Sequence, residues 1–174
     1  MARASPDAGL TFLLGGARSG KSAHAEALIA QLPPPWVYIA TAEALDSEMA
    51  ERIAAHRARR DGRWQTIEAP LELAGALSSV PEGVPVLVDC LTIWLSNHLL
   101  NEADAKAECD KLLETLRAPR GPWFAVANET GLGIVPDNPL ARRFRDAAGR
   151  LNQDVAVLAD SVLLMVAGLA MELK

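Results

Sequence analysis

The stretch that decides the fold is Leu10-Thr11-Phe12-Leu13-Leu14, followed by Gly15-Gly16-Ala17-Arg18-Ser19-Gly20-Lys21-Ser22. The first part is a short apolar run, which predicts a buried strand. The second part matches the pattern G-x-x-x-x-G-K-[ST] at every fixed position. Over residues 22–32 apolar side chains then recur at helical spacing. A glycine-rich loop between a strand and a helix predicts a phosphate-binding site.

The residue types of this loop suit the binding of a triphosphate. Glycines let the backbone turn successive N–H groups toward phosphate oxygens. Lys21 supplies positive charge to the outer phosphates, and the hydroxyl of Ser22 can bind Mg²⁺. The next helix presents its positive end to the same place. The alternative, a tight turn with an incidental lysine, leaves the strand and helix context unexplained. We therefore expect residues 15–22 to bind a nucleotide and Mg²⁺.

Further along the chain, continuous apolar strands alternate with amphipathic helices. We expect strands at 36–40, 64–67, 84–88, 123–127 and 162–166, the last being the final strand. We expect helices at 46–60 with Asp46 as its cap, at 71–79, at 91–100, at 103–116 and from Asn138-Pro139 onward. Such alternation implies a largely parallel sheet covered on both faces. The fold class is α/β, of the P-loop NTPase, RecA-like kind.

Length and composition fit one enzyme domain. We expect residues 10–174 to form a single domain and residues 1–9 to be a disordered extension. A net charge of −5 argues against a general nucleic-acid surface. Eighteen consecutive apolar residues occur nowhere, so we expect no membrane span. The two cysteines, Cys90 and Cys109, have no metal-ligand spacing. With no signal peptide, the chain is predicted to be cytoplasmic.

Several polar residues follow the expected strands directly. Asp89 ends the run Val-Leu-Val-Asp, and a carboxylate at this position can hold Mg²⁺ directly or through water. The alternative is that Asp89 caps the next helix. Thr41, Asn128 and Glu129 also follow strands. Ligands of open α/β sheets bind beyond the carboxyl ends of the strands, so we expect these four residues to share one crevice with the phosphate loop.

Of the three histidines, His56 has the most unusual surroundings. It shares a helix face with Met49 and Ile53, and four arginines lie near it in sequence: Arg52, Arg57, Arg59 and Arg60. On one interpretation these residues are a core stripe and a charged helix end. On the other, the imidazole attacks a phosphate and the guanidiniums stabilise the leaving group. His98 is expected to be structural. His24, two residues past the phosphate-loop motif, is expected to be structural or to support the residues that contact the ligand, with direct contact as the alternative.

The phosphate loop, with several later segments, resembles the bifunctional adenosylcobinamide kinase/adenosylcobinamide-phosphate guanylyltransferase family. The resemblance runs from about residue 13 to 174. Its carriers are Gly-Gly-Ala-Arg-Ser-Gly-Lys-Ser, Tyr38-Ile39-Ala40-Thr41-Ala42, Asp46-x-Glu48-Met49-x-x-Arg52-Ile53-x-x-His56-Arg57, Trp64-x-Thr66-x-Glu68, Asn128-Glu129-Thr130-Gly131-Leu132-Gly133-Ile134-Val135-Pro136, Leu140-Ala141-Arg142, Phe144-Arg145-Asp146 and Gly149-Arg150-Leu151-Asn152-Gln153. The histidine helix and the Gly-x-Gly-Ile-Val-Pro loop are the most specific of these.

The resemblance implies two reactions late in cobalamin biosynthesis. The enzyme would phosphorylate the aminopropanol hydroxyl of adenosylcobinamide with ATP or GTP. It would then transfer GMP from GTP onto that phosphate, releasing pyrophosphate. By the same resemblance His56 is the nucleophile that carries GMP. The phosphate-loop motif and the carboxylate at the strand end make Lys21 catalytic and Ser22 and Asp89 the residues that hold Mg²⁺. The implied guanine-nucleotide contacts are residues 15–22, Ala40, Thr41, Ala42, Arg57, Ala58, Arg59, Arg60, Glu68 and Asp89. The resemblance also implies a homotrimer.

Two rival hypotheses remain open at this point. A plain P-loop small-molecule kinase would use Lys21, Ser22 and Asp89 in the same roles and leave His56 as a packing residue. A nucleotide-gated regulatory protein of RecA-like fold would hydrolyse a triphosphate slowly and signal to another protein. Covalent labelling of His56 would distinguish the bifunctional enzyme from both.

Overall fold

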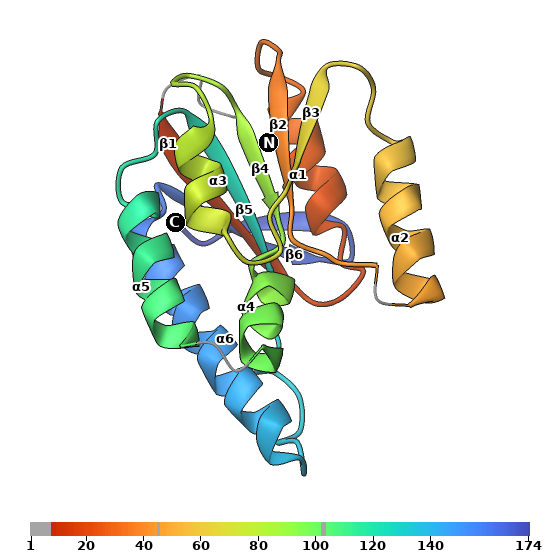
Figure 1. Cartoon of the computed structure of the whole chain (residues 1–174), viewed down its shortest axis with the longest axis vertical. Helices are drawn as coiled ribbons and strands as arrows, with labels where there is room; N and C mark the ends of the chain where they lie inside the picture. Colours follow the sequence, from red (N-terminus) through yellow and green to blue (C-terminus); the bar gives the residue numbers. More distant parts are fainter. Residues whose placement is uncertain (1–7, 45, 102–103) are drawn as a thin grey trace.

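The computed structural model describes residues 8–44, 46–101 and 104–174. In these residues the strands form one seven-stranded sheet, in the order β3-β2-β4-β5-β1-β6-β7 (Figure 1). All neighbouring pairs are parallel except β6 and β7, which are antiparallel. The strands are β1 (Gly9–Gly15), β2 (Trp36–Ala40), β3 (Trp64–Glu68), β4 (Val86–Asp89), β5 (Pro122–Asn128), β6 (Ser161–Val166) and β7 (Leu169–Glu172). The α/β prediction with a largely parallel sheet is confirmed.

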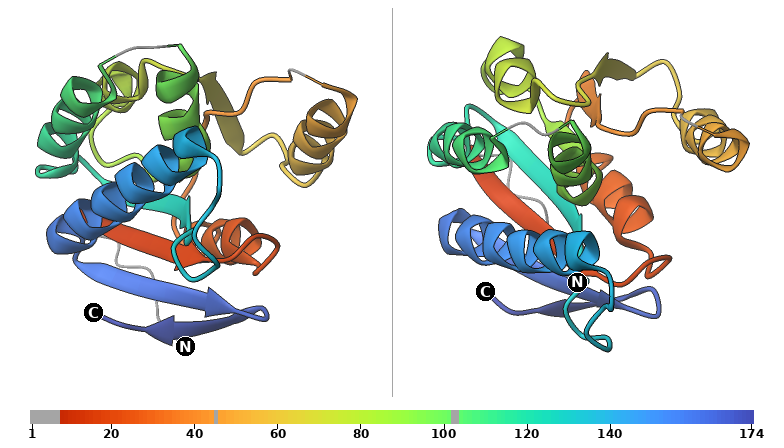
Figure 2. Two further views of the ribbon diagram at one scale, coloured as in Figure 1. Left: turned by 90° about the horizontal axis from the view of Figure 1, so that it is seen from below. Right: turned by 60° about the horizontal axis from the view of Figure 1, so that its bottom comes forward.

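The helices lie on both faces of this sheet (Figures 1 and 2). They are α1 (Lys21–Ile29), α2 (Ser47–Ala58), α3 (Leu73–Ser79), α4 (Leu91–Leu100), α5 (Ala105–Leu116) and α6 (Pro139–Leu158). One core cluster packs α3, α4, α5 and α6 against strand residues such as Phe12 and Val88. The other packs α1 against the opposite face, through residues such as Leu13 and Leu87. Alternate residues of each strand therefore serve the two layers.

Helix α2 stands apart from both layers, as the two views of Figure 2 show. Local signals account for its formation. Asp46 is its N-cap and accepts a hydrogen bond from the backbone N–H of Met49 at 2.7 Å. Glu48 lies in the first turn, where the helix dipole favours negative charge, and Arg57 lies in the last. None of the described side chains of α2 is buried. Capping and dipole effects therefore support a helix that packing supports little.

Two sequence-based predictions of the fold need correction or limitation. The strand at 162–166 is not the last, because the chain turns back at Ala167 and Gly168 and adds β7 antiparallel to β6. Both turn residues have positive φ angles, 51° and 81°, which permit so tight a turn. Strand β1 begins at Gly9, one residue before its predicted start. The prediction of disorder for residues 1–7 concerns residues outside those that the structure describes. The predicted start of a helix at residue 103 also lies outside the described residues.

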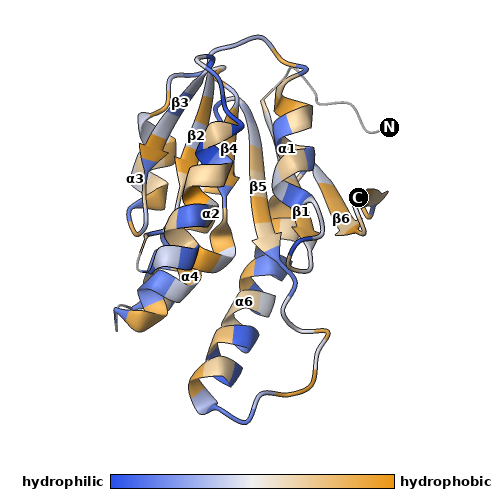
Figure 3. Cartoon of the chain, turned by 90° about the vertical axis from the view of Figure 1, so that its right-hand side faces the viewer, coloured by the Kyte–Doolittle hydropathy of each residue, from blue (hydrophilic) through white to orange (hydrophobic). Residues whose placement is uncertain are grey.

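The segment between β5 and α6 carries apolar side chains into solvent. Figure 3 shows this loop extending beyond the sheet with α6, and hydrophobic residues lie along it. Leu132 is 89% exposed and Ile134 97% exposed. Asn138 caps α6 by accepting hydrogen bonds from two backbone N–H groups, and Pro139 follows it as predicted. In the described part of the chain, no helix combines the length and apolarity needed to cross a membrane.

Candidate functional site

A cavity of about 500 Å³ lies between the phosphate loop, the carboxyl ends of β2 and β4, and one face of α2. This volume suits a ligand of nucleotide size, since small-molecule sites commonly measure about 300–1,000 Å³. Residues from all of these segments line it: Ala17, Arg18, Ser19, Gly20, Lys21, Ser22, Ala23, Tyr38, Ala40, Ala42, Met49, Ile53, Ala55, His56, Arg57, Arg59, Arg60, Asp89, Cys90, Ile93, Val126 and Asn128. The sheet thus brings together segments that are far apart in the sequence.

The phosphate loop forms a tight turn between β1 and α1. Gly20, at the N-cap of α1, has a φ of 96°, which glycine adopts without steric penalty. Lys21 is buried, and its ammonium group donates a hydrogen bond to the carbonyl oxygen of Gly16 at 2.6 Å. Burial lowers the pKa of Lys21, while the charge of Asp89 opposes this shift. The lysine is therefore positioned by the loop itself.

The β6–β7 hairpin supports this loop from behind. The backbone N–H of Gly168 donates to the carbonyl oxygen of Ser19 at 3.0 Å. A Cβ atom on Gly15 would lie 2.5 Å from the carbonyl oxygen of Met165, a distance that real Cβ atoms essentially never show. Gly15 therefore allows the loop to approach β6 closely, and the hairpin helps to fix the loop's position.

Asp89 is held at the end of β4 by a tyrosine. The Tyr38 hydroxyl donates to Oδ2 of Asp89 at 3.0 Å, and the Arg60 guanidinium lies 3.5 Å from the centre of the Tyr38 ring. Burial, and then the negative charge of Asp89, raise the pKa of Tyr38. The N-cap of α4 is Cys90, and no side chain caps that helix. The interpretation of Asp89 as a helix cap is therefore wrong.

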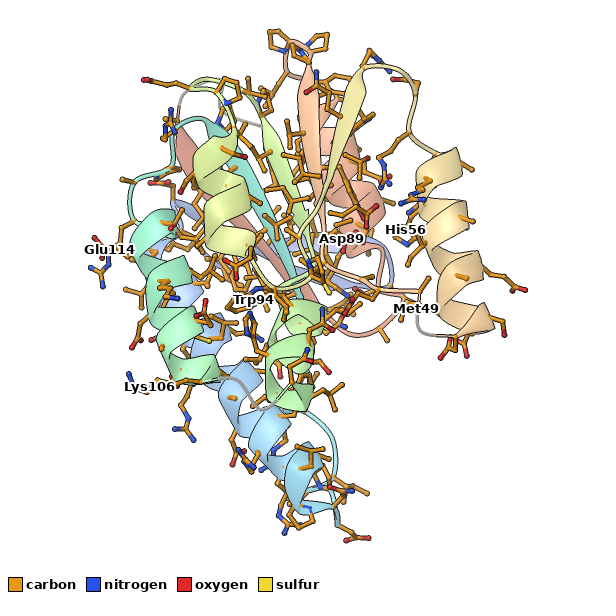
Figure 4. The ribbon with its side chains drawn as sticks, in the orientation of Figure 1. Met49, His56, Asp89, Trp94, Lys106 and Glu114 are labelled. Atoms are coloured by element: carbon orange, nitrogen blue, oxygen red, sulfur yellow. The ribbon has the colours of Figure 1, made fainter. Side chains whose placement is uncertain are left out.

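His56 lies on the face of α2 turned toward Asp89 (Figure 4). Its Nδ1 is 3.8 Å from Oδ2 of Asp89 and 2.9 Å from Nη2 of Arg59. Met49 and Ile53 share this face, as predicted, but they line the cavity instead of joining either core cluster. The core-stripe interpretation of this face is therefore wrong. The site combines an imidazole, guanidinium groups and a phosphate loop, which suits nucleophilic attack on a phosphate.

Thr41 does not lie where the sequence analysis placed it. It is fully buried and outside the cavity lining. Its hydroxyl donates to the carbonyl oxygen of Cys90 and accepts from the backbone N–H of Cys90, each at 2.8 Å. Asn97 donates to the Thr41 carbonyl oxygen at 2.9 Å. Thr41 therefore fastens the end of β2 to the residue after Asp89, because its side chain turns into the protein and not toward the crevice.

Other predicted residues lie near the cavity without lining it. Glu68 forms an ion pair with Arg57, which does line the cavity. Ala58 lies outside the lining. Glu129 lies outside the lining as well, and its carboxylate accepts a hydrogen bond from the backbone N–H of Gly131 at 2.6 Å. Of the residues expected to share the crevice, Asp89 and Asn128 line it and Glu129 does not. Gly15 and Gly16 also lie outside the lining.

Neither of the two remaining histidines lines the cavity. His98 is buried, 3.2 Å from the carbonyl oxygen of Leu71 through Nε2, and its ring packs edge-on against Trp94. This confirms the structural role predicted for His98. His24 lies in α1, directly after Ala23, which lines the cavity.

The residues near the phosphate loop suit magnesium better than a metal that needs a preformed cage. Ser22 and Asp89 both line the cavity, and the Asp89 side chain is 11% exposed. Where the chain is described, no three His, Cys, Asp or Glu side chains gather as a metal site. Mg²⁺ is commonly held by one or two protein oxygens together with phosphates and water. A hydroxyl and a carboxylate beside a phosphate site fit that pattern.

The sequence pattern does not single out Tyr38 as a site residue, because Tyr38 lies within the apolar run Trp-Val-Tyr-Ile-Ala, which predicts only a buried strand. A signal was present in the register. Side chains two apart on a strand share a face, so Tyr38 and Ala40 point the same way. Ala40 pairs with Asp89 in the sheet. A phenol two residues before the end of a strand can thus reach a carboxylate at the end of its neighbour.

Comparison with known proteins agrees with this geometry. The family model described as cobinamide kinase / cobinamide phosphate guanyltransferase matches residues 11–173. The bifunctional adenosylcobalamin biosynthesis protein CobP of Pseudomonas aeruginosa is 51% identical over 166 residues, covering 94% of this chain and 96% of its own. The bifunctional adenosylcobalamin biosynthesis protein CobU of Escherichia coli is 38% identical over 181 residues, covering 95% and 99%.

Solved structures show the fold at much lower sequence identity. The ATPase EscN of the enteropathogenic E. coli type III secretion system matches with a TM-score of 0.57 and 11% identity, over 92% of this chain and 43% of its own. A KaiC-like protein from Pyrococcus horikoshii matches with a TM-score of 0.51 and 11% identity, over 91% and 72%. These likenesses place the fold among the P-loop NTPases. From the family match and the two bifunctional relatives, the chain belongs to the cobinamide kinase/cobinamide phosphate guanyltransferase family.

Proposed function

We propose that this chain is a bifunctional enzyme of adenosylcobalamin biosynthesis. It phosphorylates the aminopropanol hydroxyl of adenosylcobinamide with ATP or GTP, then transfers GMP from GTP to that phosphate and releases pyrophosphate. The observation that carries this proposal is that one cavity is lined by both the phosphate loop and His56. A kinase needs the loop alone, whereas guanylyl transfer through a covalent intermediate also needs a nucleophile.

In the kinase step the protein mainly positions and neutralises phosphate groups. The ammonium group of Lys21, held by the loop carbonyl of Gly16, interacts with the outer phosphates. The residues that would hold magnesium are Ser22 and Asp89, which both line the cavity. When bound, magnesium supplies positive charge to the phosphate oxygens. The substrate hydroxyl attacks the γ-phosphorus, and the bond to the β–γ bridging oxygen breaks.

In the second step His56 is the nucleophile. A ring nitrogen attacks the α-phosphorus of GTP, the bond to the α–β bridging oxygen breaks, and pyrophosphate leaves with the electron pair. Guanidinium groups of Arg57, Arg59 and Arg60 line the same cavity and stabilise negative charge on the phosphates. The phosphate of adenosylcobinamide phosphate then attacks the same phosphorus, and the P–N bond breaks. Because GMP is transferred in two successive steps, GTP and adenosylcobinamide phosphate, which are both negatively charged, need not react with each other directly.

The remaining predictions carried by the family resemblance stay proposals. Ala40, Ala42, Ala58 and Glu68 are proposed to contact guanine nucleotide, whereas Thr41 is fully buried and holds the end of β2 beside them. A cytoplasmic homotrimer is expected. The exposed side chains of Leu132 and Ile134 offer apolar surface of the kind that a bulky corrinoid or a second subunit would cover.

The proposal is tested by assaying the two half-reactions separately in His56→Ala. Transfer of GMP to cobinamide phosphate, followed as pyrophosphate release, should fall below detection, because the covalent acceptor is gone. Phosphorylation of cobinamide should continue, since Lys21 and the loop are intact. Glu51→Ala, at an exposed position of the same helix, is the control and should keep both activities. Equal pyrophosphate release by His56→Ala and the parent would exclude His56 as the covalent acceptor, whereas no pyrophosphate release by the parent would leave the chain a plain kinase.

A further inference from the structure

Two groups of opposite chemistry approach the same nitrogen of His56. Nη2 of Arg59 lies 2.9 Å from Nδ1, and Oδ2 of Asp89 lies 3.8 Å from it. A guanidinium can only donate a hydrogen bond, and an ionised carboxylate can only accept one. They therefore favour different tautomers of the neutral ring. Contact with Arg59 requires a lone pair on Nδ1 and places the proton on Nε2. Contact with Asp89 places the proton on Nδ1 and the lone pair on Nε2.

The Asp89 carboxylate is the better fixed of the two partners. It ends β4 inside the sheet, pairs in register with Ala40 of β2, and is only 11% exposed. The Tyr38 hydroxyl holds its Oδ2 at 3.0 Å. The Tyr38 ring is buried and covered by the guanidinium of Arg60, 3.5 Å from the ring centre. A buried, hydrogen-bonded side chain of this kind keeps its position when a ligand enters.

Arg59, in contrast, is held loosely. Its side chain is 45% exposed, it follows the last residue of α2, and its other charged partner, Oε1 of Glu26, is 3.7 Å away. It also lines the cavity in which the triphosphate is proposed to bind. Phosphate oxygens bind guanidinium strongly and often through two parallel hydrogen bonds. A bound triphosphate therefore competes with Nδ1 of His56 for Arg59, and it does not compete for Asp89.

We propose that Nε2 of His56 is the atom that takes GMP, with Asp89 accepting a hydrogen bond from Nδ1–H and Tyr38 acting as the positioning residue for Asp89. This inference rests on the proposed guanylyl transfer. The Nε2 lone pair forms the bond to the α-phosphorus, and the bond to the α–β bridging oxygen breaks toward pyrophosphate. The proton stays on Nδ1, where Asp89 balances the positive charge of the ring. When GMP leaves, the P–N electron pair returns to Nε2.

The assignment is compatible with a second task for the same carboxylate. Both Tyr38 and Nδ1 of His56 approach Oδ2 of Asp89. Asp89 would hold magnesium or its bound water in the proposed kinase step, and the same side chain would thereby serve both half-reactions.

The bonded nitrogen can be identified directly. Protein labelled with ¹⁵N-histidine is incubated with GTP and Mg²⁺, and ¹⁵N–³¹P and long-range ¹H–¹⁵N couplings are recorded on the intact protein before the adduct can rearrange. We expect phosphorus on Nε2. Phosphorus on Nδ1 would overturn the inference while upholding the proposed function. It would mean that the nitrogen in contact with Arg59 is the one that attacks GTP. A protein that binds GTP without any adduct would overturn the proposed function itself.

The role of Tyr38 is tested with Tyr38→Phe, which keeps the ring under Arg60 and removes the hydroxyl. We expect the rate of adduct formation at saturating GTP to fall about 10-fold, as for one hydrogen bond, with the half-saturating GTP concentration unchanged. Trp64→Phe is the matched control: its ring packs edge-on to Tyr38 at 6.3 Å between centroids, and this change should alter the rate less than about twofold. An unchanged rate in Tyr38→Phe, or a rise in half-saturating GTP alone, would exclude the positioning role.

Discussion

Helices α1 and α2 each bring one half of the proposed chemistry to the cavity, yet they are built very differently. Helix α1 follows the phosphate loop and buries Lys21, Ala25, Leu28 and Ile29 against the sheet. Helix α2 carries His56 and has no buried side chain among those described. The phosphate-binding half is thus part of the core, whereas the nucleophile-bearing half is supported by a cap, by charges and by contacts across the cavity.

This difference matches what each half must do. A phosphate loop serves both half-reactions and gains from being preorganised by packing. The nucleophile serves one half-reaction and must admit a nucleotide between itself and the loop. Weakly packed elements are those from which binding and reacting segments are commonly drawn. Substitutions should therefore separate the halves: changes around α1 should affect stability or both activities, and changes on α2 should affect guanylyl transfer.

The largest effect is expected from Lys21→Ala. Because both steps need the triphosphate held and neutralised, both activities should fall about 100-fold or more, as when one fixed donor to a developing charge is removed. Initial rates of cobinamide phosphorylation and of pyrophosphate release provide the measurement. If either activity stayed near the parent rate, the loop would not serve both reactions and the comparison would fail.

A matched pair of isoleucines sharpens the comparison at the level of stability. Ile29→Ala empties a fully buried position of the α1 core and should lower the free energy of unfolding by about 2–5 kcal/mol. Ile53→Ala removes a half-buried side chain from the cavity wall and should lower it by less than about 1 kcal/mol. Urea unfolding followed by circular dichroism measures both. Equal losses would show that α2 is packed as firmly as α1.

A smaller effect is expected at Thr41, which joins the end of β2 to the residue after Asp89. Thr41→Val removes the hydroxyl that bonds both backbone groups of buried Cys90 and should lower the free energy of unfolding by about 1–3 kcal/mol. Both activities should also decrease, because Asp89 immediately precedes Cys90. Thr66→Val, at an exposed position of β3, is the control. A Thr41→Val protein as stable and active as the parent would mean that this contact does not position Asp89.

Much of the fold and the phosphate site could be predicted because their signals are local. The glycine pattern, the apolar strands and the caps at Asp46 and Asn138 each depend on a few neighbouring residues. The order of the sheet beyond the parallel pattern is not local. Strand β7 was missed because its four residues are all exposed, and so it lacks the buried run that identifies a strand. The one local signal for β7 is the glycine of the turn at Ala167-Gly168.

The errors in the site have the same origin. Tyr38 lies on β2 and Thr41 directly follows it. Side chains on a strand point alternately to its two faces, and this alternation no longer applies once the strand has ended. Thr41 turned out to be buried, and Tyr38 turned out to bond Asp89. Sequence periodicity located the end of the strand, whereas the pairing of β2 with β4 decided which side chains reach the cavity.

The most direct test of the account is the mass of the intact protein after incubation with GTP and Mg²⁺ in the absence of cobinamide. We predict a gain of one GMP that is lost after brief acid treatment, as a phosphoramidate should be, and that does not form in His56→Ala. Tight binding of GTP without any covalent gain would contradict the account, and would return His56 to a structural role in a plain kinase.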